Sequence, residues 1–359
     1  MEGPPRVEPL LSSGVDLRFK SEVTAVTPGP SVVTPLEKTA YDSVVIATGS
    51  VAVQVRFPGF EKSGVHMLNS AEAYFRLFEA CADYSRVAVL GEGFASLEAA
   101  ENLMRLSIDT TLFSHGRPLL AHFHSSLRKV LFESAGSLGL RVQDALMHKA
   151  VGVGRVEAVM VGDEVLPCDA VAVVPQRIPL FPPVPILPGR LGGIVVDAEM
   201  RCGIPGVFVA GDCAEYPVGR GSRLMMLRPT AEAGGKIAGV NATGGSAKLV
   251  PVGCFSRHLF GLEVSAAGLG LDEALSLGFD AAESAFASSS STVASVVFHR
   301  RSGRVLGIQH VGNRRLSTEF LTMSVARGVH LGELALMETA GSTDISAILE
   351  AAREGMEVG

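Results

Sequence analysis

The segment RVAVLGEGFASLEAAENL, residues 86–103, constrains the fold more than any other part of this 359-residue chain. Its first five residues are mostly apolar and predict a short buried strand, and the spacing after the glycine-rich turn predicts a helix over 97–106. The apolar residues at 110–113 predict a second strand. Strand, helix and strand make a β-α-β unit of about 30 residues, which pairs parallel strands and indicates an α/β domain.

Three small residues in the turn of this unit predict a dinucleotide-binding site. Gly91 permits a tight turn, Gly93 lets the backbone approach a pyrophosphate, and the small Ser96 lets helix and strand pack closely. The phosphates would face the amino terminus of the helix, where unpaired N–H groups and the helix dipole favour anions.

The end of the second strand decides which nicotinamide nucleotide is bound. Residues 113–117 read FSHGR and lack the acidic side chain that holds the ribose 2′-hydroxyl of NAD. His115 and Arg117 could instead meet the 2′-phosphate of NADP, although a solvated turn accounts for them about as well. The sequence favours NADPH only slightly.

Two further apolar runs end in glycine, which is typical of a buried strand that meets a ligand. Ala47, Thr48 and Gly49 close the run over 41–50, and Gly211 and Asp212 close the run over 206–212. Asp212 could accept hydrogen bonds from a polyhydroxyl chain such as ribitol. It could also be the N-cap of the segment that follows it.

The composition narrows the class of partner. A net charge of −6 without a cluster of Lys or Arg argues against nucleic acid and favours a small-molecule substrate. No apolar run approaches the roughly 18 residues that span a bilayer, which argues against a membrane protein. Because the first residues do not resemble a signal peptide, we expect a cytoplasmic protein.

The cysteines do not predict a metal site or a disulfide framework, because none belongs to a C-x-x-C pair. They are Cys81, Cys168, Cys202, Cys213 and Cys254. We assign them to packing, since small buried cysteines are usually inert.

The motifs follow an order that resembles the flavin-dependent pyridine nucleotide disulfide oxidoreductases. The order is ATG at 47–49, GEGFAS at 91–96, GIPGVFVAGDCAE at 203–215 and RPTAEAGGKIAGVNATGG at 228–245. Within that family the chain is most similar to the coenzyme A disulfide reductase and NADH oxidase branch. That similarity lies in FGLEVSAAGLGLDEALSLGFD at 260–280 and SGRVLGIQHVG at 302–312.

The resemblance implies two cofactors, FAD and NAD(P)H, and assigns residues to each. At the FAD it implies Ala47, Thr48 and Gly49 by the adenosine and pyrophosphate, Gly211 and Asp212 at the ribitol, and Pro229, Thr230 and Ala231 near the isoalloxazine. At the nicotinamide nucleotide it implies Gly91, Gly93, Phe94, Ser96 and Glu98. Glu98 could instead be a charge favoured by the helix dipole. No catalytic residue is assigned.

The implied fold class is α/β, with FAD- and NAD(P)-binding doubly wound (Rossmann-like) domains and a C-terminal α+β dimerisation domain. The implied divisions are a partial FAD-binding segment over 1–57, an NAD(P)-binding domain over 58–180, a second FAD-binding segment over 181–247 and the dimerisation domain over 248–359. The implied activity passes hydride from NAD(P)H through flavin to a disulfide, a persulfide or sulfur, or dioxygen. A homodimer is implied.

Three departures from the family pattern leave a second hypothesis open. Family members begin with a strand, a glycine-rich turn and an acidic strand end that bind the flavin ADP, then a redox cysteine, and this sequence starts after them. Residues 173–176 lack the usual glycine, and 337–342 lack the tyrosine and prolines of the branch. The alternative is a truncated or split, non-catalytic subunit that binds nicotinamide nucleotide or needs a partner chain to complete the FAD site.

Overall fold

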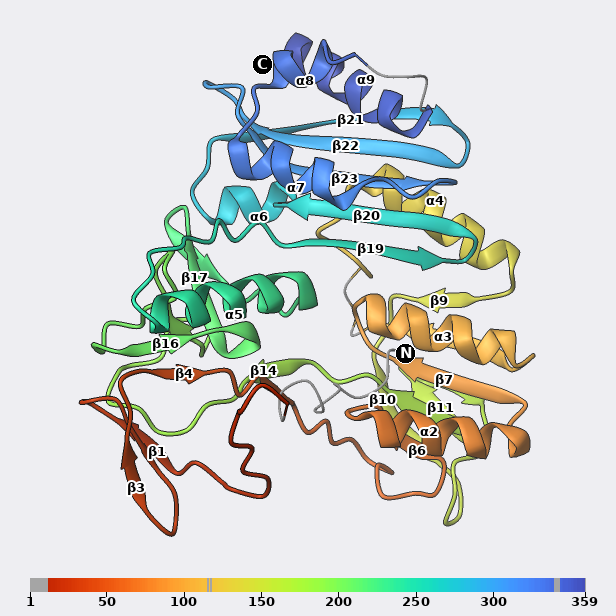
Figure 1. The fold of residues 1–359 in the computed structure, drawn as a ribbon. Coiled ribbons are helices and arrows are strands. Elements are labelled where there is room, and N and C mark those ends of the chain that lie inside the picture. The colour runs from red at the N-terminus through yellow and green to blue at the C-terminus, as the bar shows by residue number, and fades with distance from the viewer. Residues whose placement is uncertain (1–11, 115, 117, 339–342, 359) are drawn as a thin grey trace.

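Three lobes make up the computed structural model, which describes residues 12–114, 116, 118–338 and 343–358 (Figure 1). The β4–β16 lobe lies at the lower left of Figure 1, the parallel-sheet lobe at the lower right and the C-terminal lobe at the top. Strand β4 pairs with β16 although the whole parallel-sheet lobe lies between them in sequence. The parallel-sheet lobe is therefore an insertion within the β4–β16 lobe.

The parallel-sheet lobe holds five strands in the order β6-β13-β7-β8-β9, and every neighbouring pair is parallel. These strands are β6 (Val65–Met67), β13 (Ala170–Val173), β7 (Arg86–Leu90), β8 (Asp109–Phe113) and β9 (Arg141–Gln143). Helices cover one face: α2 (Ala71–Ala80), which continues into η1 (Cys81–Asp83), α3 (Phe94–Arg105) and α4 (Ser125–Ser137). An antiparallel meander covers the other: β10 (Met147–Val151), β11 (Ala158–Val161) and β12 (Glu164–Pro167).

Alternation along β7 explains why both faces are covered. Val87 and Val89 pack with Leu97 of α3, whereas Ala88 and Leu90 pack on the meander side. Because a parallel sheet is apolar on both faces, each face needs its own layer.

The β4–β16 lobe has three small sheets. They contain β1 (Ala25–Thr27), β2 (Ser31–Val33) and β3 (Lys38–Ala40); β4 (Val44–Ile46) and β16 (Val207–Val209); and β15 (Ile194–Val195), β17 (Ala214–Val218) and β18 (Gly221–Arg223). The 3₁₀ turn η2 (Gly211–Cys213) and α5 (Arg228–Ala242) follow β16 and β18. An antiparallel ribbon of β5 (Ser50–Ala52) and β14 (Arg177–Pro179) joins this lobe to the parallel-sheet lobe.

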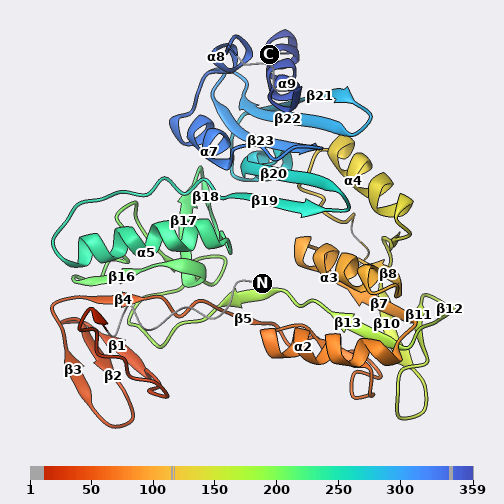
Figure 2. The ribbon, with the colours of Figure 1, turned by 45° about the vertical axis from the view of Figure 1, so that its right-hand side comes forward.

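The C-terminal lobe is an antiparallel sheet in the order β19-β20-β23-β22-β21. Its strands are β19 (Cys254–Leu259), β20 (Leu262–Gly268), β21 (Ala281–Ser289), β22 (Thr292–His299) and β23 (Val305–Gly312), with helices α6 (Leu271–Ser276), α7 (Thr318–Arg327), α8 (Leu331–Ala335) and α9 (Thr343–Val358). Figure 2 shows this lobe above the other two, and its edge strand β19 contacts both α3 and α5. The predicted α/β class with a C-terminal α+β unit is confirmed.

The predicted elements differ from the observed ones mainly at their ends. Helix α7 spans Thr318–Arg327 and has Ser317 as its N-cap. Helix α3 begins at Phe94, before the predicted residue 97, because its N-cap Gly93 has no side chain to signal a helix start. The first strand, β1, begins at Ala25, and the described residues before it are largely exposed. Among the described helices, none is both long and apolar enough to cross a membrane.

Candidate functional site

The two glycines of the turn between β7 and α3 have different structural roles. A Cβ atom on Gly91 would lie 2.8 Å from Cβ of Ser96 and 3.1 Å from Cβ of Val174, so a side chain there would push α3 from the sheet. A Cβ atom on Gly93 would meet nothing within 4 Å. Ser96 is buried, and its hydroxyl donates to the carbonyl of Gly93 at 2.6 Å. Gly91 therefore allows close packing, and Gly93 leaves open space beside the amino terminus of α3.

The amino terminus of α3 can receive an anion. Its N-cap, Gly93, offers no side-chain acceptor to the first-turn N–H groups. Unpaired N–H groups and the positive end of the helix dipole both favour negative charge at such a position. Beside it, Gln176 Nε2 donates to Glu92 Oε2 at 3.3 Å, so the segment that lacks the usual glycine contacts this turn directly.

The C-terminal lobe covers the start of α3. The ring of Phe94 lies 5.5 Å from that of Phe123 and 4.8 Å from that of Phe255 on β19, measured between centroids. Arg257, also on β19, pairs with Glu98 with 2.9 Å between Nε and Oε1. Glu98 is thus an ion-pair partner across two lobes as well as a charge near the amino end of α3.

A second group of predicted residues gathers where β4 and β16 end. The two strands are parallel, and Ala210 N donates to Ile46 O at 3.0 Å, so their carboxyl ends lie together. Gly49 (φ +74°) and Gly211 (φ +81°) have left-handed backbone that suits glycine. A Cβ on Gly49 would meet nothing within 4 Å, and one on Gly211 only Cβ of Ala231, at 3.8 Å. The end of β4, η2 and the first turn of α5 therefore lie close together, and the backbone of Gly49 and Gly211 is open on the side where a Cβ would stand. We call the region beside these residues the β4–η2–α5 space.

Polar side chains at this place are held by the β5–β14 ribbon and its extension. Thr48 Oγ1 donates to Leu180 O at 2.5 Å. Asp212 Oδ2 accepts from Ser50 Oγ at 2.8 Å, and Ser50 Oγ accepts from Arg177 Nε at 2.8 Å. Asp212 lies inside η2, whose N-cap is Ala210, so the alternative that Asp212 is an N-cap is wrong.

Two adjoining cavities lie between the amino ends of α3 and α5. One, of about 370 Å³, is lined by Phe94 of α3 and by Leu227, the N-cap of α5. The other, of about 1130 Å³, is lined by Pro229 of α5 and by Cys254 of β19. Glu98 lines both. The first turns of α3 and α5 therefore face the same space, with β19 as a wall.

Two predicted residues, His115 and Arg117, lie outside the described residues. Of the other predicted positions, Ala47, Thr48, Gly49, Gly211 and Ala231 lie at the β4–η2–α5 space, with Thr230 buried in the first turn of α5. Among the residues that the structure describes, no group of three or more His, Cys, Asp or Glu side chains could hold a metal ion.

Three of the cysteines are closed to thiolate chemistry. Burial raises the pKa of the thiols of Cys81, Cys168 and Cys213, that of Cys168 to about 12. The Cys213 thiol donates to Ala210 O at 3.3 Å. Because a thiol, unlike a thiolate, is a poor nucleophile, these three residues serve packing.

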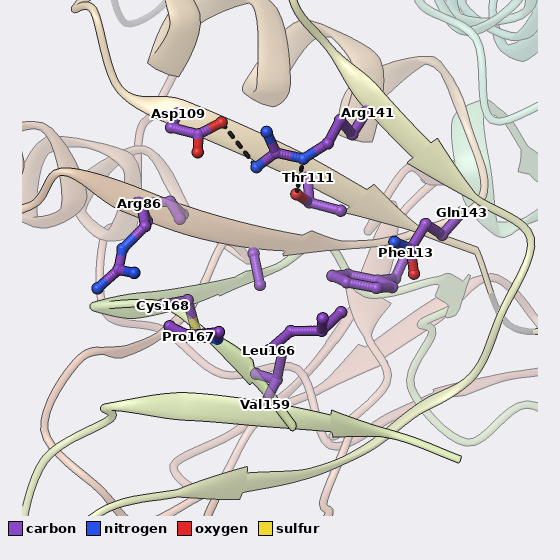
Figure 3. Close-up of a pocket in the computed structure, with 12 residues that line it drawn as sticks. Arg86, Asp109, Thr111, Phe113, Arg141, Gln143, Val159, Leu166, Pro167 and Cys168 are labelled. Atoms are coloured by element: carbon purple, nitrogen blue, oxygen red, sulfur yellow. Dashed lines mark hydrogen bonds and ion pairs between the residues drawn. The ribbon is translucent and has the colours of Figure 1, made fainter. Parts of the chain in front are cut away.

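A further pocket, of about 270 Å³, lies on the meander face of the parallel sheet (Figure 3). Figure 3 shows Arg141 of β9 turned toward Asp109 of β8, and their Nη2 and Oδ1 atoms are 2.7 Å apart. Cys168 lies below the strands among apolar residues of β11 and β12. Since α3 covers the opposite face, this pocket is separate from the dinucleotide turn.

Three side chains that meet this region were not predicted from the sequence: Phe255, Arg257 and Gln309, all in the C-terminal lobe. Strand spacing indicates that they lie in a sheet, and no local motif indicates that they face α3 or the loop before α4. Their contacts depend on how the lobes pack.

Comparisons with known proteins agree on one family. Its model, described as pyridine nucleotide-disulphide oxidoreductase, matches residues 6–235. The chain is 31% identical over 315 residues to "Probable ferredoxin reductase CtmF" of Castellaniella defragrans, covering 84% of this chain and 74% of that protein. It is 24% identical to an NADH oxidase of Streptococcus pneumoniae, covering 92% of this chain and 78% of the oxidase. A NAD-dependent persulfide reductase from A. fulgidus has the same fold, with a TM-score of 0.83, 22% identity, and coverage of 96% of this chain and 69% of that one.

Proposed function

The chain belongs to the pyridine nucleotide-disulphide oxidoreductase family, and from that premise we propose that its α3 turn binds NAD(P)H while its β4–η2–α5 space binds FAD. It is an FAD-dependent NAD(P)H oxidoreductase. The observation that carries the proposal is that the amino ends of α3 and α5 face the same pair of adjoining cavities, both of which Glu98 and Leu227 line.

Gly91, Gly93, Phe94, Ser96 and Glu98 form the nucleotide site. The open side of Gly93 admits the pyrophosphate to the amino terminus of α3, where helix dipole and N–H groups bind it. Gly91 and Ser96 allow β7 and α3 to pack closely, which directs the amino terminus of α3 toward the pyrophosphate. Phe94 and Glu98 extend the site toward α5 along the cavity wall.

The residues at the second site fit a flavin dinucleotide. Gly49 and Gly211 leave the backbone accessible, and the amino terminus of α5 has no side-chain cap, so it is open to a polar ligand. Asp212 supplies a carboxylate acceptor for ribitol hydroxyls, held in place by Ser50. Ala47 and Thr48 lie on the adenosine side. Pro229, Thr230 and Ala231 of α5 lie on the isoalloxazine side.

A flavin held by these residues would supply the redox chemistry, taking up hydride from the nicotinamide and passing electrons to an acceptor. The protein would orient the two cofactors and exclude water from them. The rings of Phe94, Phe123 and Phe255 pack together at one wall of the smaller cavity and close it with apolar surface. Arg257 neutralises Glu98 at the boundary of the two cavities.

The acceptor is a disulfide, a persulfide or sulfur, or dioxygen, and the substrate is a small molecule. We assign the chain to the cytoplasm as a homodimer that pairs through its C-terminal lobe. We also propose domain limits of 1–57 with 181–247, 58–180 and 248–359, and the pairing of β4 with β16 across the parallel-sheet lobe supports the division of the first domain into two segments.

One measurement tests the proposal: the absorbance of the purified chain, before and after NADH or NADPH is added. A flavin spectrum that bleaches on addition supports the enzyme. A colourless chain that still binds nicotinamide nucleotide contradicts FAD binding by this chain alone. Flavin absorbance that appears only with a second chain present supports a flavin site shared with a partner.

A further inference from the structure

The segment between β8 and α4, which the structure describes at residues 114, 116 and 118–124, follows the end of the second strand of the β-α-β unit. In dinucleotide-binding domains the end of the second strand recognises the adenosine ribose, and this loop begins there. Asp144 holds its start, since Asp144 Oδ1 accepts from Ser114 Oγ at 3.2 Å and from Leu119 N at 3.4 Å. The other end of the loop is held from outside the lobe.

Gln309 is the residue that holds it. It lies on β23, the central strand of the C-terminal sheet, and its side chain is almost fully buried, with 3% of the residue exposed. Its Nε2 donates to His122 O at 2.9 Å, and its Oε1 accepts from His124 N at 2.9 Å. One side-chain amide therefore clamps the backbone on both sides of Phe123.

A second residue of the C-terminal lobe keeps the loop at the same place. A Cβ atom on Gly270, the N-cap of α6, would lie 2.3 Å from His122 O and 3.3 Å from Gln309 Nε2. The carbonyl that Gln309 binds thus rests directly on the backbone of Gly270. Only a residue without a side chain allows this approach.

The segment that Gln309 holds contacts the turn before α3 through one pair of aromatic rings. Phe123 is buried, and its ring centroid lies 5.5 Å from that of Phe94, the first residue of α3 and the neighbour of Gly93. A shift of the backbone at 122–124 therefore moves the packing partner of Phe94 as well as the loop itself.

We propose that Gln309 is a positioning residue for nicotinamide-nucleotide binding: it fixes the β8–α4 loop through the backbone of His122 and His124. This inference rests on the proposed binding of NAD(P)H at α3. It makes the affinity for the nucleotide depend on the docking of the C-terminal lobe, which contributes no residue to the β-α-β unit itself.

The test compares Gln309→Met with Gly270→Ala, which displaces the same carbonyl sterically. Gln309→Met keeps the length of the side chain but removes its two hydrogen bonds to the loop, together with the one that Ser295 Oγ donates to Gln309 Oε1. Ser265→Ala is the control, since Ser265 is buried in the same sheet and its hydroxyl donates to Ser256 Oγ at 3.0 Å. Dissociation constants for NADH and NADPH are measured by nicotinamide fluorescence, at a temperature where melting curves show every variant folded. Flavin content is recorded in parallel.

Both test variants should bind nucleotide about tenfold more weakly, the size of one or two lost net hydrogen bonds, with flavin content unchanged. Ser265→Ala should bind like the parent chain. If the parent chain binds NAD(P)H and both test variants bind it equally well, Gln309 is only structural and the inference is wrong, even if both melt at lower temperature. If the parent chain binds no nucleotide, the proposed function fails and the inference fails with it.

Discussion

Arg257 Nε lies 2.9 Å from Glu98 Oε1, which joins β19 of the C-terminal lobe to α3 just beyond its first turn. Both side chains are 43% exposed, so the pair adds little to stability. Its position matters more, because Arg257 places a positive charge beside the cavity into which the α3 terminus opens.

We expect Arg257→Gln to leave the melting temperature nearly unchanged and to weaken NAD(P)H binding about threefold, since a half-exposed charge contributes under about 1 kcal/mol. Titration at low and at high salt measures this, because screening should reduce the difference between the two chains. Arg105→Gln is the matched control. Arg105 pairs with Glu101 at the far end of the same helix, and its loss should not change affinity.

A Gly→Ala substitution in the α3 turn should lower stability at Gly91 and nucleotide affinity at Gly93. Gly91→Ala forces a contact with Ser96 and should cost about 1–3 kcal/mol of unfolding free energy, as overpacking does. Gly93→Ala has room for its Cβ and an allowed backbone (φ −117°), so the melting temperature should hold while nucleotide affinity falls. Unchanged affinity in Gly93→Ala would place the pyrophosphate elsewhere.

The carboxylate of Asp212 should matter for flavin retention. Asp212→Asn keeps the shape but removes the charge, and should lower FAD affinity by more than about tenfold, because hydrogen bonds to charged acceptors are the stronger ones. Ser50→Ala keeps the carboxylate and removes its 2.8 Å donor together with the acceptor of Arg177 Nε, so the loss of FAD affinity should be smaller. The ratio of flavin absorbance to protein after gel filtration measures both. If both variants lose FAD equally, flavin retention depends on the β5–β14 ribbon and not on the carboxylate of Asp212.

His66 should make the chain less stable in mild acid. Burial, with a smaller contribution from Arg76, lowers the pKa of His66 below its ordinary value of about 6.5. The unfolded chain then binds more protons, so this contribution to stability is present above pH 6.5 and is lost as pH falls toward the folded-state pKa. His66→Gln, which can keep a hydrogen bond to Tyr84, should flatten the fall in melting temperature between pH 7 and pH 5. If the melting temperatures of both chains fall equally between pH 7 and pH 5, His66 is not the cause of the acid sensitivity.

Local sequence determined the parts of this protein whose geometry depends on neighbours in the chain. The spacing of Gly91, Gly93 and Ser96 predicts a strand, a tight turn and a helix, and the structure has them, with only the helix start displaced to Phe94. The parallel sheet followed from the β-α-β pattern, since short apolar strands joined by helices can pair in few ways.

Tertiary packing alone decided what surrounds that turn. In the sequence, Phe255 and Arg257 have no feature that distinguishes them from other strand residues. Gln309 is a polar residue within a buried strand. They meet Glu98, Phe94 and the backbone at 122–124 because the C-terminal sheet docks across α3 and the β8–α4 loop. A side-chain contact between distant segments depends on the relative placement of whole lobes, and local spacing does not contain that placement.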